Sequence, residues 1–335
     1  MLVTGGSGTI GARMVERLLD LRVEVVRVLG RDETKQFYQQ QRHAGRAELR
    51  FLVGDIRDRD RLARAMEGID VVFHCAALKH VGSSEYNPFE ATQTNIVGPQ
   101  HVIDASLENE VGTMIFTSSD KAANPTNVMG ATKLVAEKLV TAATNYRGRH
   151  STTFASVRFG NVLGSRGSAL ELFASQIAAG GPVTMTDPEM TRFVMSTDRA
   201  VDLSLRAAAL AHGGEVFILK MPIARLEDLV GAAIEAFAPL YGRDPASIGI
   251  SSIAPRPGEK PYEELMTEDE SRRAVDIDDM FAVLPSIDTG GPIAEAYGHA
   301  DAVPVGAYRS DHGEVMDRAT IVDLLRSTAI RGIVA

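Results

Sequence analysis

An acid, a base and a hydroxyl group stand next to one another in the run Ser119-Asp120-Lys121. The apolar residues Met114 to Phe116 come just before them, a pattern typical of a buried strand that ends at a site. Pro125 ends any strand, and Asn127 is a good N-cap for a helix that continues with helical spacing through Val140. The sequence thus predicts polar groups at a strand end, followed by a turn and a helix.

Met129 and Lys133 lie one turn apart on this predicted helix, so they share one face. If that face turns toward the strand end, a carboxyl group, two amines and a hydroxyl surround one small volume. We interpret this volume as the active site. The alternative for Asp120 and Lys121 is an exposed charge pair on a loop.

The chain begins with a short apolar strand, Leu2 to Thr4, then a glycine-rich turn and an amphipathic helix to about Asp20. This order makes a phosphate cradle, because glycine lets the backbone approach a pyrophosphate whose charge the helix N-terminus stabilises. The arrangement is that of a Rossmann fold, with Gly-x-x-Gly-x-x-Gly spacing; the alternative is a plain glycine-rich turn. The shortness of the first strand suggests that a few N-terminal residues are missing. The predicted cofactor ligands here are Gly5, Ser7, Gly8, Thr9, Ile10 and Gly11.

A second predicted strand, Val23 to Leu29, is followed by Gly30 and Arg31. In this fold a carboxylate at that point binds the ribose hydroxyl of NAD, whereas an arginine beside a small residue suits the extra phosphate of NADP. We therefore predict NADP, with Arg31 and Lys35 on the phosphate, while NAD remains possible. The alternative is a solvated loop in which Asp32 accepts from the ribose.

The composition excludes several classes of function. A net charge of −9 over 335 residues argues against nucleic acid or an anionic membrane as a partner, since either needs a basic face. Cys75 is the single cysteine, so no disulfide forms within the chain, and a reducing cytoplasm fits best. We find no apolar run long enough to cross a bilayer, no signal peptide and no metal-ligand cluster, and expect a cytoplasmic protein.

Separate motifs from Leu2 to about Pro285 resemble one family, the polysaccharide-biosynthesis dehydratases, which are UDP-N-acetylglucosamine 4,6-dehydratases of the extended short-chain dehydrogenase/reductase group. The resemblance implies an α/β fold, with a Rossmann-type doubly wound parallel sheet and a smaller C-terminal substrate-binding domain. We expect the first domain at residues 1–180, rejoined by about 195–222, and the second with a C-terminal arm at 181–335. The motifs are Ala76–Val81, Tyr86–Ala91, Ser119–Ala122, Asn124–Lys133, Arg158–Ser165, Asp187–Phe193 and Arg256–Lys260.

The resemblance also implies a mechanism, in which hydride passes from sugar C4 to NADP and returns to C6 after water leaves. Lys121 would be the base at C5 and Asp120 the acid for the leaving hydroxyl, since neighbouring groups can split their pKa values. Ser119 would bind the C4 oxygen, and Lys133 would hold the nicotinamide ribose. The resemblance further suggests a homo-oligomer, either a dimer or a hexamer.

Met129 departs from the tyrosine that most short-chain enzymes carry, and a thioether has no proton to exchange. We interpret it as a core methionine without a catalytic role, which leaves open the group that replaces the tyrosine. The substitution also leaves the product configuration at C5 open: methionine occurs here chiefly in long enzymes associated with retention. The tail at 308–311 resembles the short inverting enzymes.

Further ligands follow from the resemblance and from local patterns. Asp55 and Ile56 would flank the adenine, although Asp55 could instead cap the next helix. A long helix is expected over Ala91 to Asn109, and Asn95 within it could brace the catalytic strand or face water. For each arginine of the second half, the alternative to ligand binding is a surface salt bridge. The other predicted cofactor ligands are Ala76, Ala77, Lys79 and Asn95, and the predicted substrate ligands are Lys79, His80, Arg158, Asn161, Ser165, Thr184, Arg192, Arg256 and Glu259.

Two other functions remain possible from the sequence. A nucleotide-sugar 4-epimerase would use the same scaffold, but it usually needs the tyrosine that Met129 displaces. A non-catalytic NADP-binding sensor has no need of the acid and base at Asp120 and Lys121. The sequence leaves open the sugar and the pathway.

Overall fold

The computed structural model describes residues 1–255, 258–287 and 291–328. Contacts divide the chain into two compact units. Unit 1 comprises Met1–Arg158, Val201–Lys220 and Leu265–Ala307, and unit 2 comprises Phe159–Ala200, Met221–Glu264 and the described part of Tyr308–Ala335. No helix among the described residues is both long and apolar enough to cross a membrane.

Unit 1 is built on a ten-stranded sheet in the order β16-β14-β15-β10-β6-β5-β4-β1-β2-β3. The run from β10 to β3 is parallel, and the chain reverses its direction of winding between β1 and β4. This is the predicted doubly wound sheet, and the prediction is confirmed. The strands are β1 (Leu2–Thr4), β2 (Val26–Gly30), β3 (Leu49–Val53), β4 (Val71–His74), β5 (Thr113–Thr117), β6 (Thr153–Arg158), β10 (Val216–Leu219), β14 (Ala274–Ile277), β15 (Met280–Val283) and β16 (Asp301–Ala302).

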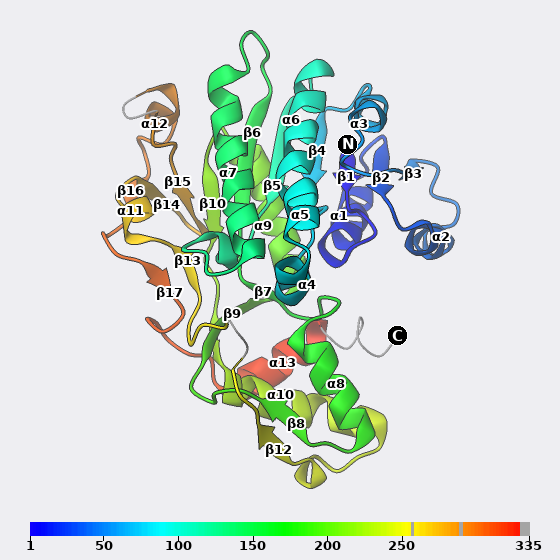
Figure 1. Ribbon diagram of the computed structural model, residues 1–335, viewed down its shortest axis with the longest axis vertical. Coiled ribbons are helices and arrows are strands. Elements are labelled where there is room, and N and C mark those ends of the chain that lie inside the picture. The colour runs from blue at the N-terminus through cyan, green and yellow to red at the C-terminus, as the bar shows by residue number, and fades with distance from the viewer. Residues whose placement is uncertain (256–257, 288–290, 329–335) are drawn as a thin grey trace. The chain divides into compact units, whose positions relative to one another are not determined.

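Helices α6 and α7 lie side by side on one face of this sheet, and α9 lies behind it (Figure 1). Apolar side chains of α3, α6 and α7 pack on those of the central strands, among them Val102, Phe116 and Phe154, and make one continuous core. The helical segments are α1 (Thr9–Asp20), α2 (Glu33–Arg42), α3 (Arg59–Met66), α4 (Val81–Tyr86), α5 (Pro88–Thr92), η1 (Gln93–Val97), α6 (Gly98–Glu108), η2 (Asp120–Ala122), α7 (Val128–Tyr146), α9 (Thr197–Leu210, which begins in unit 2), α11 (Glu268–Ser271) and α12 (Pro292–Ala296).

Unit 2 has its own core, in which α8 and α13 pack against α10. Strands β11, β9 and β7 form a small sheet, and β12 pairs with β8. The elements are β7 (Asn161–Val162), α8 (Ala169–Ala179), β8 (Val183–Met185), β9 (Thr191–Met195), β11 (Ile223–Arg225), α10 (Leu226–Phe237), η3 (Ala238–Tyr241), η4 (Pro245–Ser247), β12 (Ile250–Ser252), β13 (Glu264–Met266, at the boundary of the units), β17 (Tyr308–Arg309) and α13 (Arg318–Thr328).

The boundaries of the units differ from the expected domains at two places. Residues 159–180, expected in the first domain, belong to unit 2 because α8 packs on α10 and β8. Residues 265–307, expected in the second domain, belong to unit 1 because β15 pairs antiparallel with β10 and β14 pairs with β15. The observed return at Val201–Lys220 lies within the expected range of about 195–222.

Candidate active site

The turn between β1 and α1 needs glycine for reasons that the geometry makes explicit. Gly5 has a φ of +66°, and its N–H donates to the Leu29 carbonyl at 2.7 Å. A Cβ atom on Gly5 would lie 2.8 Å from the Ala76 backbone, and one on Gly11 would lie 2.3 Å from the Gly5 carbonyl oxygen. Helix α1 begins after Gly8 with no side-chain cap. An open cradle at a helix N-terminus fits the pyrophosphate of a dinucleotide.

Charged side chains gather where β2 and β3 end. Asp32 caps α2 by accepting from the Lys35 N–H at 2.9 Å, and it pairs with the Lys35 ammonium at 2.7 Å. The half-exposed Arg31 lies 3.6 Å from the Asp55 carboxylate, which also pairs with Arg57 at 2.7 Å. Burial raises the pKa of Asp55, but hydrogen bonds from Arg57 outweigh it and leave that pKa below its usual range. The Asp32 carboxylate is therefore engaged within α2, as its N-cap and as the partner of Lys35. Arg31 directly follows Gly30, at the position predicted for a phosphate ligand.

Helix α3 is capped by Asp58, which accepts from the Arg61 N–H at 2.9 Å, so Asp55 does not cap it. Ile56 is buried, and a Cβ atom on Gly98 would lie 2.6 Å from its Cδ1. Lys79 and His80 are both exposed, at the start of α4.

Asn95 differs from expectation both in its secondary structure and in its surroundings. The helix expected over 91–109 is divided by a π-helical turn, η1, which contains this residue. Asn95 does not face water: it is buried, its Nδ2 donates to the Leu78 carbonyl and the Thr132 hydroxyl, and its Oδ1 accepts from the Leu78 N–H. Because both Nδ2 hydrogens are used within the protein, Asn95 braces the loop after β4 against α7 and has no side-chain donor left for a cofactor.

The acid, base and hydroxyl group at the end of β5 do lie together. The Ser119 hydroxyl donates to Asp120 Oδ1 at 2.6 Å, and the Lys121 ammonium donates to Asp120 Oδ2 at 2.9 Å. Asp120 is buried, while about a third of the Lys121 side chain is exposed (33%). The pair is therefore anchored on its carboxylate and open on its amine.

Helix α7 approaches this segment closely. Asn127 caps it by accepting from the Gly130 N–H at 2.9 Å, as predicted, and a Cβ atom on Gly130 would lie 2.3 Å from the Lys121 carbonyl oxygen. One turn further on, the buried Lys133 ammonium donates to the Thr117 carbonyl at 2.8 Å. Burial lowers the pKa of Lys133 to about 8. Met129 is buried, consistent with a core methionine.

Arg158 was expected beside the substrate, and that prediction is wrong. The side chain is fully buried and pairs with Glu137 at 2.6 Å and with Glu270 at 2.9 Å. Sequence reasoning missed both carboxylates. Glu137 could have been found from its position one turn after Lys133 on a buried helix face. For Glu270 the only local signal is the capping box that it forms with Thr267.

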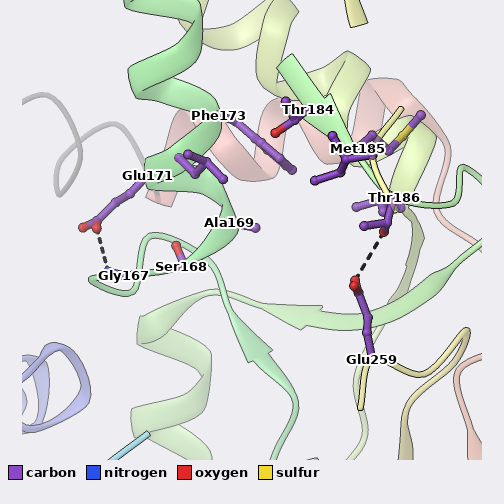
Figure 2. A pocket seen from close by; sticks show the side chains of 12 residues that line it. Gly167, Ser168, Ala169, Glu171, Phe173, Thr184, Met185, Thr186 and Glu259 are labelled. Atoms are coloured by element: carbon purple, nitrogen blue, oxygen red, sulfur yellow. Dashed lines mark hydrogen bonds between the residues drawn. The ribbon is translucent and has the colours of Figure 1, made fainter. Parts of the chain in front are cut away.

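Unit 2 contains a cavity of about 460 Å³ (Figure 2). Two predicted substrate ligands line it, Thr184 and Glu259, and Glu259 accepts from the Thr186 hydroxyl at 3.3 Å. Glu171 turns toward the start of α8 and accepts from the Gly167 N–H at 2.6 Å. The lining residues are Gly167, Ser168, Ala169, Glu171, Leu172, Phe173, Thr184, Met185, Thr186, Leu226, Ile253 and Glu259.

The other described residues that were predicted as ligands in unit 2 lie outside this lining. Arg192 pairs with Glu259 at 3.4 Å and with Glu263 at 3.7 Å, so it holds a residue of the cavity wall. Asn161 donates through Nδ2 to Glu263 and to the Phe193 carbonyl. Ser165 precedes α8, which begins only at Ala169. Arg256 lies outside the described residues.

Residues 1–285 match the sequence profile of the family described as polysaccharide biosynthesis protein. The chain belongs to this family. The predicted resemblance to polysaccharide-biosynthesis dehydratases is thereby confirmed.

Three curated proteins with different descriptions are similar to this chain over most of its length. The chain is 52% identical over 285 residues to an uncharacterized membrane protein of Methanocaldococcus jannaschii, covering 85% of each chain. It is 40% identical over 289 residues to the UDP-N-acetylglucosamine 4,6-dehydratase (inverting) of Campylobacter jejuni, covering 86% of this chain and 83% of that protein. It is 38% identical over 288 residues to the UDP-glucose 4-epimerase of Rickettsia conorii, covering 84% and 82%.

A solved structure agrees over nearly the whole length. The X-ray structure of Pen from Bacillus thuringiensis has 45% sequence identity and a TM-score of 0.89, and the match covers 97% of this chain and 96% of that one. The fold of this family member is therefore shared with an experimentally determined relative.

Proposed function

We propose that the protein is a nucleotide-sugar 4,6-dehydratase that converts UDP-N-acetylglucosamine to a UDP-4-keto-6-deoxy sugar, with inversion at C5, through bound NADP. The observation that carries the proposal is the Asp120–Lys121 pair, buried on its carboxylate and open on its amine. The similarity to the inverting Campylobacter jejuni dehydratase supports the choice of substrate and configuration.

The residues of unit 1 fit a dinucleotide cofactor. The glycine turn at Gly5, Gly8 and Gly11 would hold the pyrophosphate, Arg31 the ribose phosphate and Lys133 the nicotinamide ribose. When bound, the nicotinamide group supplies the acceptor and donor of hydride for the sugar. Ser119, whose hydroxyl already lies against Asp120, would bind the C4 oxygen.

Asp120 and Lys121 can exchange one proton across their 2.9 Å contact. This transfer would turn the ion pair into a neutral amine and a carboxylic acid. Once C4 is a ketone, the Lys121 amine would take the C5 proton, whose bonding electrons form the C5–C6 double bond. The C6–O bond would break as Asp120 donates its proton, so water leaves and the ion pair is restored.

Incubation of UDP-N-acetylglucosamine with the purified protein and NADP in deuterated water tests this proposal. NMR of the early product is expected to show a 4-keto-6-deoxy sugar that carries deuterium at C5, with ring couplings of the inverted configuration. Couplings of the original configuration would make the enzyme a retaining dehydratase. A C4 epimer would favour the epimerase activity of the Rickettsia relative. No reaction with the cofactor bound would favour first another nucleotide sugar and then a sensor.

The choice of NADP predicts the effect of Arg31→Ala. Loss of a charge-assisted hydrogen bond costs about 1.5–3 kcal/mol, so Kd for NADP should rise about 10- to 150-fold while Kd for NAD changes little. Fluorescence titration of both cofactors measures this. Arg46→Ala, which removes a surface arginine paired only with Glu48 among the described contacts, is the matched control. An unchanged preference between the two cofactors would refute the role of Arg31.

A further inference from the structure

The Arg158 guanidinium uses all five of its N–H donors within unit 1. Nε and one terminal nitrogen donate to the Glu137 carboxylate at 3.0 and 2.6 Å. Two of the other three hydrogens are donated to the two Glu270 carboxylate oxygens, each at 2.9 Å. The last is donated to the Leu265 carbonyl, also at 2.9 Å. A saturated planar clamp of this kind fixes the position of both carboxylates.

Two carboxylates around one guanidinium leave one negative charge unmatched. Burial raises the pKa of Glu270, but Arg158 outweighs it and holds that pKa at about 2, so Glu270 stays ionised. The exposed Lys138 contributes positive charge near Glu270. Glu137, which is 1% exposed, lies one turn after Lys133 on the inward face of α7. Since an unmatched buried charge is costly, Lys133 is the natural counterion for this cluster.

The other groups near the Lys133 amine supply no negative charge. It donates to the neutral Thr117 carbonyl and lies 4.5 Å from the centre of the Phe116 ring. Burial lowers the pKa of His74 to about 3 and raises the pKa of Cys75 to about 12, so both side chains stay uncharged near neutral pH.

Acidic groups on the elements packed against α7 have partners elsewhere. On α5, Glu90 pairs with Arg57; on α6, Asp104 accepts from Gln100 and Glu108 pairs with Arg59. On η2, Asp120 and Lys121 pair with each other. On α4, Glu85 accepts from the Val128 N–H at the start of α7, at 2.6 Å. Cys75 and Glu137 are the two groups that raise the pKa of Lys133 against the effect of its burial. Because the Cys75 thiol stays neutral near neutral pH, Glu137 is the one of these two that carries a negative charge there.

We propose that Glu137, clamped by Arg158, keeps Lys133 charged and its ammonium on the Thr117 carbonyl, which makes Glu137 and Arg158 positioning residues of the reaction. The functional part of this inference rests on the proposed role of Lys133 at the cofactor. The charge coupling itself depends only on the buried cluster.

The Glu137→Gln variant tests the coupling. Lysine side chains of the full chain are labelled with ¹³C and titrated by NMR, with the Lys133 signal assigned from Lys133→Arg. We expect the pKa of Lys133 to fall by about 1 unit. In the pH profile of kcat for UDP-N-acetylglucosamine, the alkaline limb should move to lower pH by the same amount, because activity is lost as pH rises through the pKa of Lys133. Glu270→Gln, which leaves the Glu137 carboxylate in place, should produce a smaller shift.

The outcomes separate this inference from the proposed function. An unchanged Lys133 pKa in folded Glu137→Gln overturns the coupling, even if the wild-type protein dehydrates the sugar. A lowered pKa in a protein that shows no turnover supports the coupling and counts against the proposed function instead. If Glu137→Gln does not fold, Glu137→Asp is titrated, and a smaller fall is expected because the charge moves away by one methylene; no fall overturns the inference.

Discussion

Replacing Lys121 by methionine is expected to lower kcat for UDP-N-acetylglucosamine by about 10³-fold, the usual contribution of a positioned acid or base. Methionine keeps the length and apolar stem of lysine but cannot accept the C5 proton. About a third of the Lys121 side chain is exposed, so the substitution should leave the core and the affinity for NADP unchanged. Product formation by NMR, with Kd for NADP measured in parallel, checks both parts of this expectation.

Lys220→Met is the matched control. Lys220 has nearly the same exposure, 31%, and also pairs with a carboxylate, that of Asp276, at 2.6 Å. It directly follows β10, which β6 separates from β5 in the sheet. Its turnover should stay within about twofold of wild type, as expected for a surface ion pair. If Lys121→Met kept more than a tenth of wild-type kcat, Lys121 would not be the base.

The phosphate turn and the start of α7 could be predicted because their requirements are local. Gly11 packs so closely on the Gly5 carbonyl that it has no room for a Cβ atom, and Asn127 caps a helix that begins at the next residue. Side-chain type at fixed spacing is sufficient information for such features. The Ser119-Asp120-Lys121 cluster could be predicted for the same reason, since the three residues are consecutive.

The Arg158 cluster could not be predicted, because its members are 21 and 112 residues apart along the chain. An arginine at a strand end has the same local pattern whether it binds a ligand or a buried carboxylate. The antiparallel strands β14 and β15 escaped prediction for a related reason: their place beside β10 depends on long-range pairing. Only the assembled sheet determines which partner each residue meets.

Replacing Arg158 by methionine is expected to lower the free energy of unfolding by about 3–5 kcal/mol, the cost of breaking a buried ion pair by removing one partner. Glu137 and Glu270 would be left in the core without their shared counterion. Urea unfolding followed by circular dichroism measures the loss. A loss below about 1 kcal/mol would mean that the carboxylates find other partners and that the clamp is not structural.

The triple variant Arg158→Met, Glu137→Gln and Glu270→Gln separates stability from positioning. Removing the carboxylates together with the guanidinium should recover most of the lost stability, because a buried ion cluster is often no better than a neutral core of similar volume. Glutamine at 270 also keeps an oxygen that can accept from the Thr267 N–H. Lys133 should nevertheless titrate at lower pH than in the wild type, since its carboxylate counterion is gone. A stable triple variant with a lowered Lys133 pKa would therefore show that the cluster serves Lys133 rather than the fold.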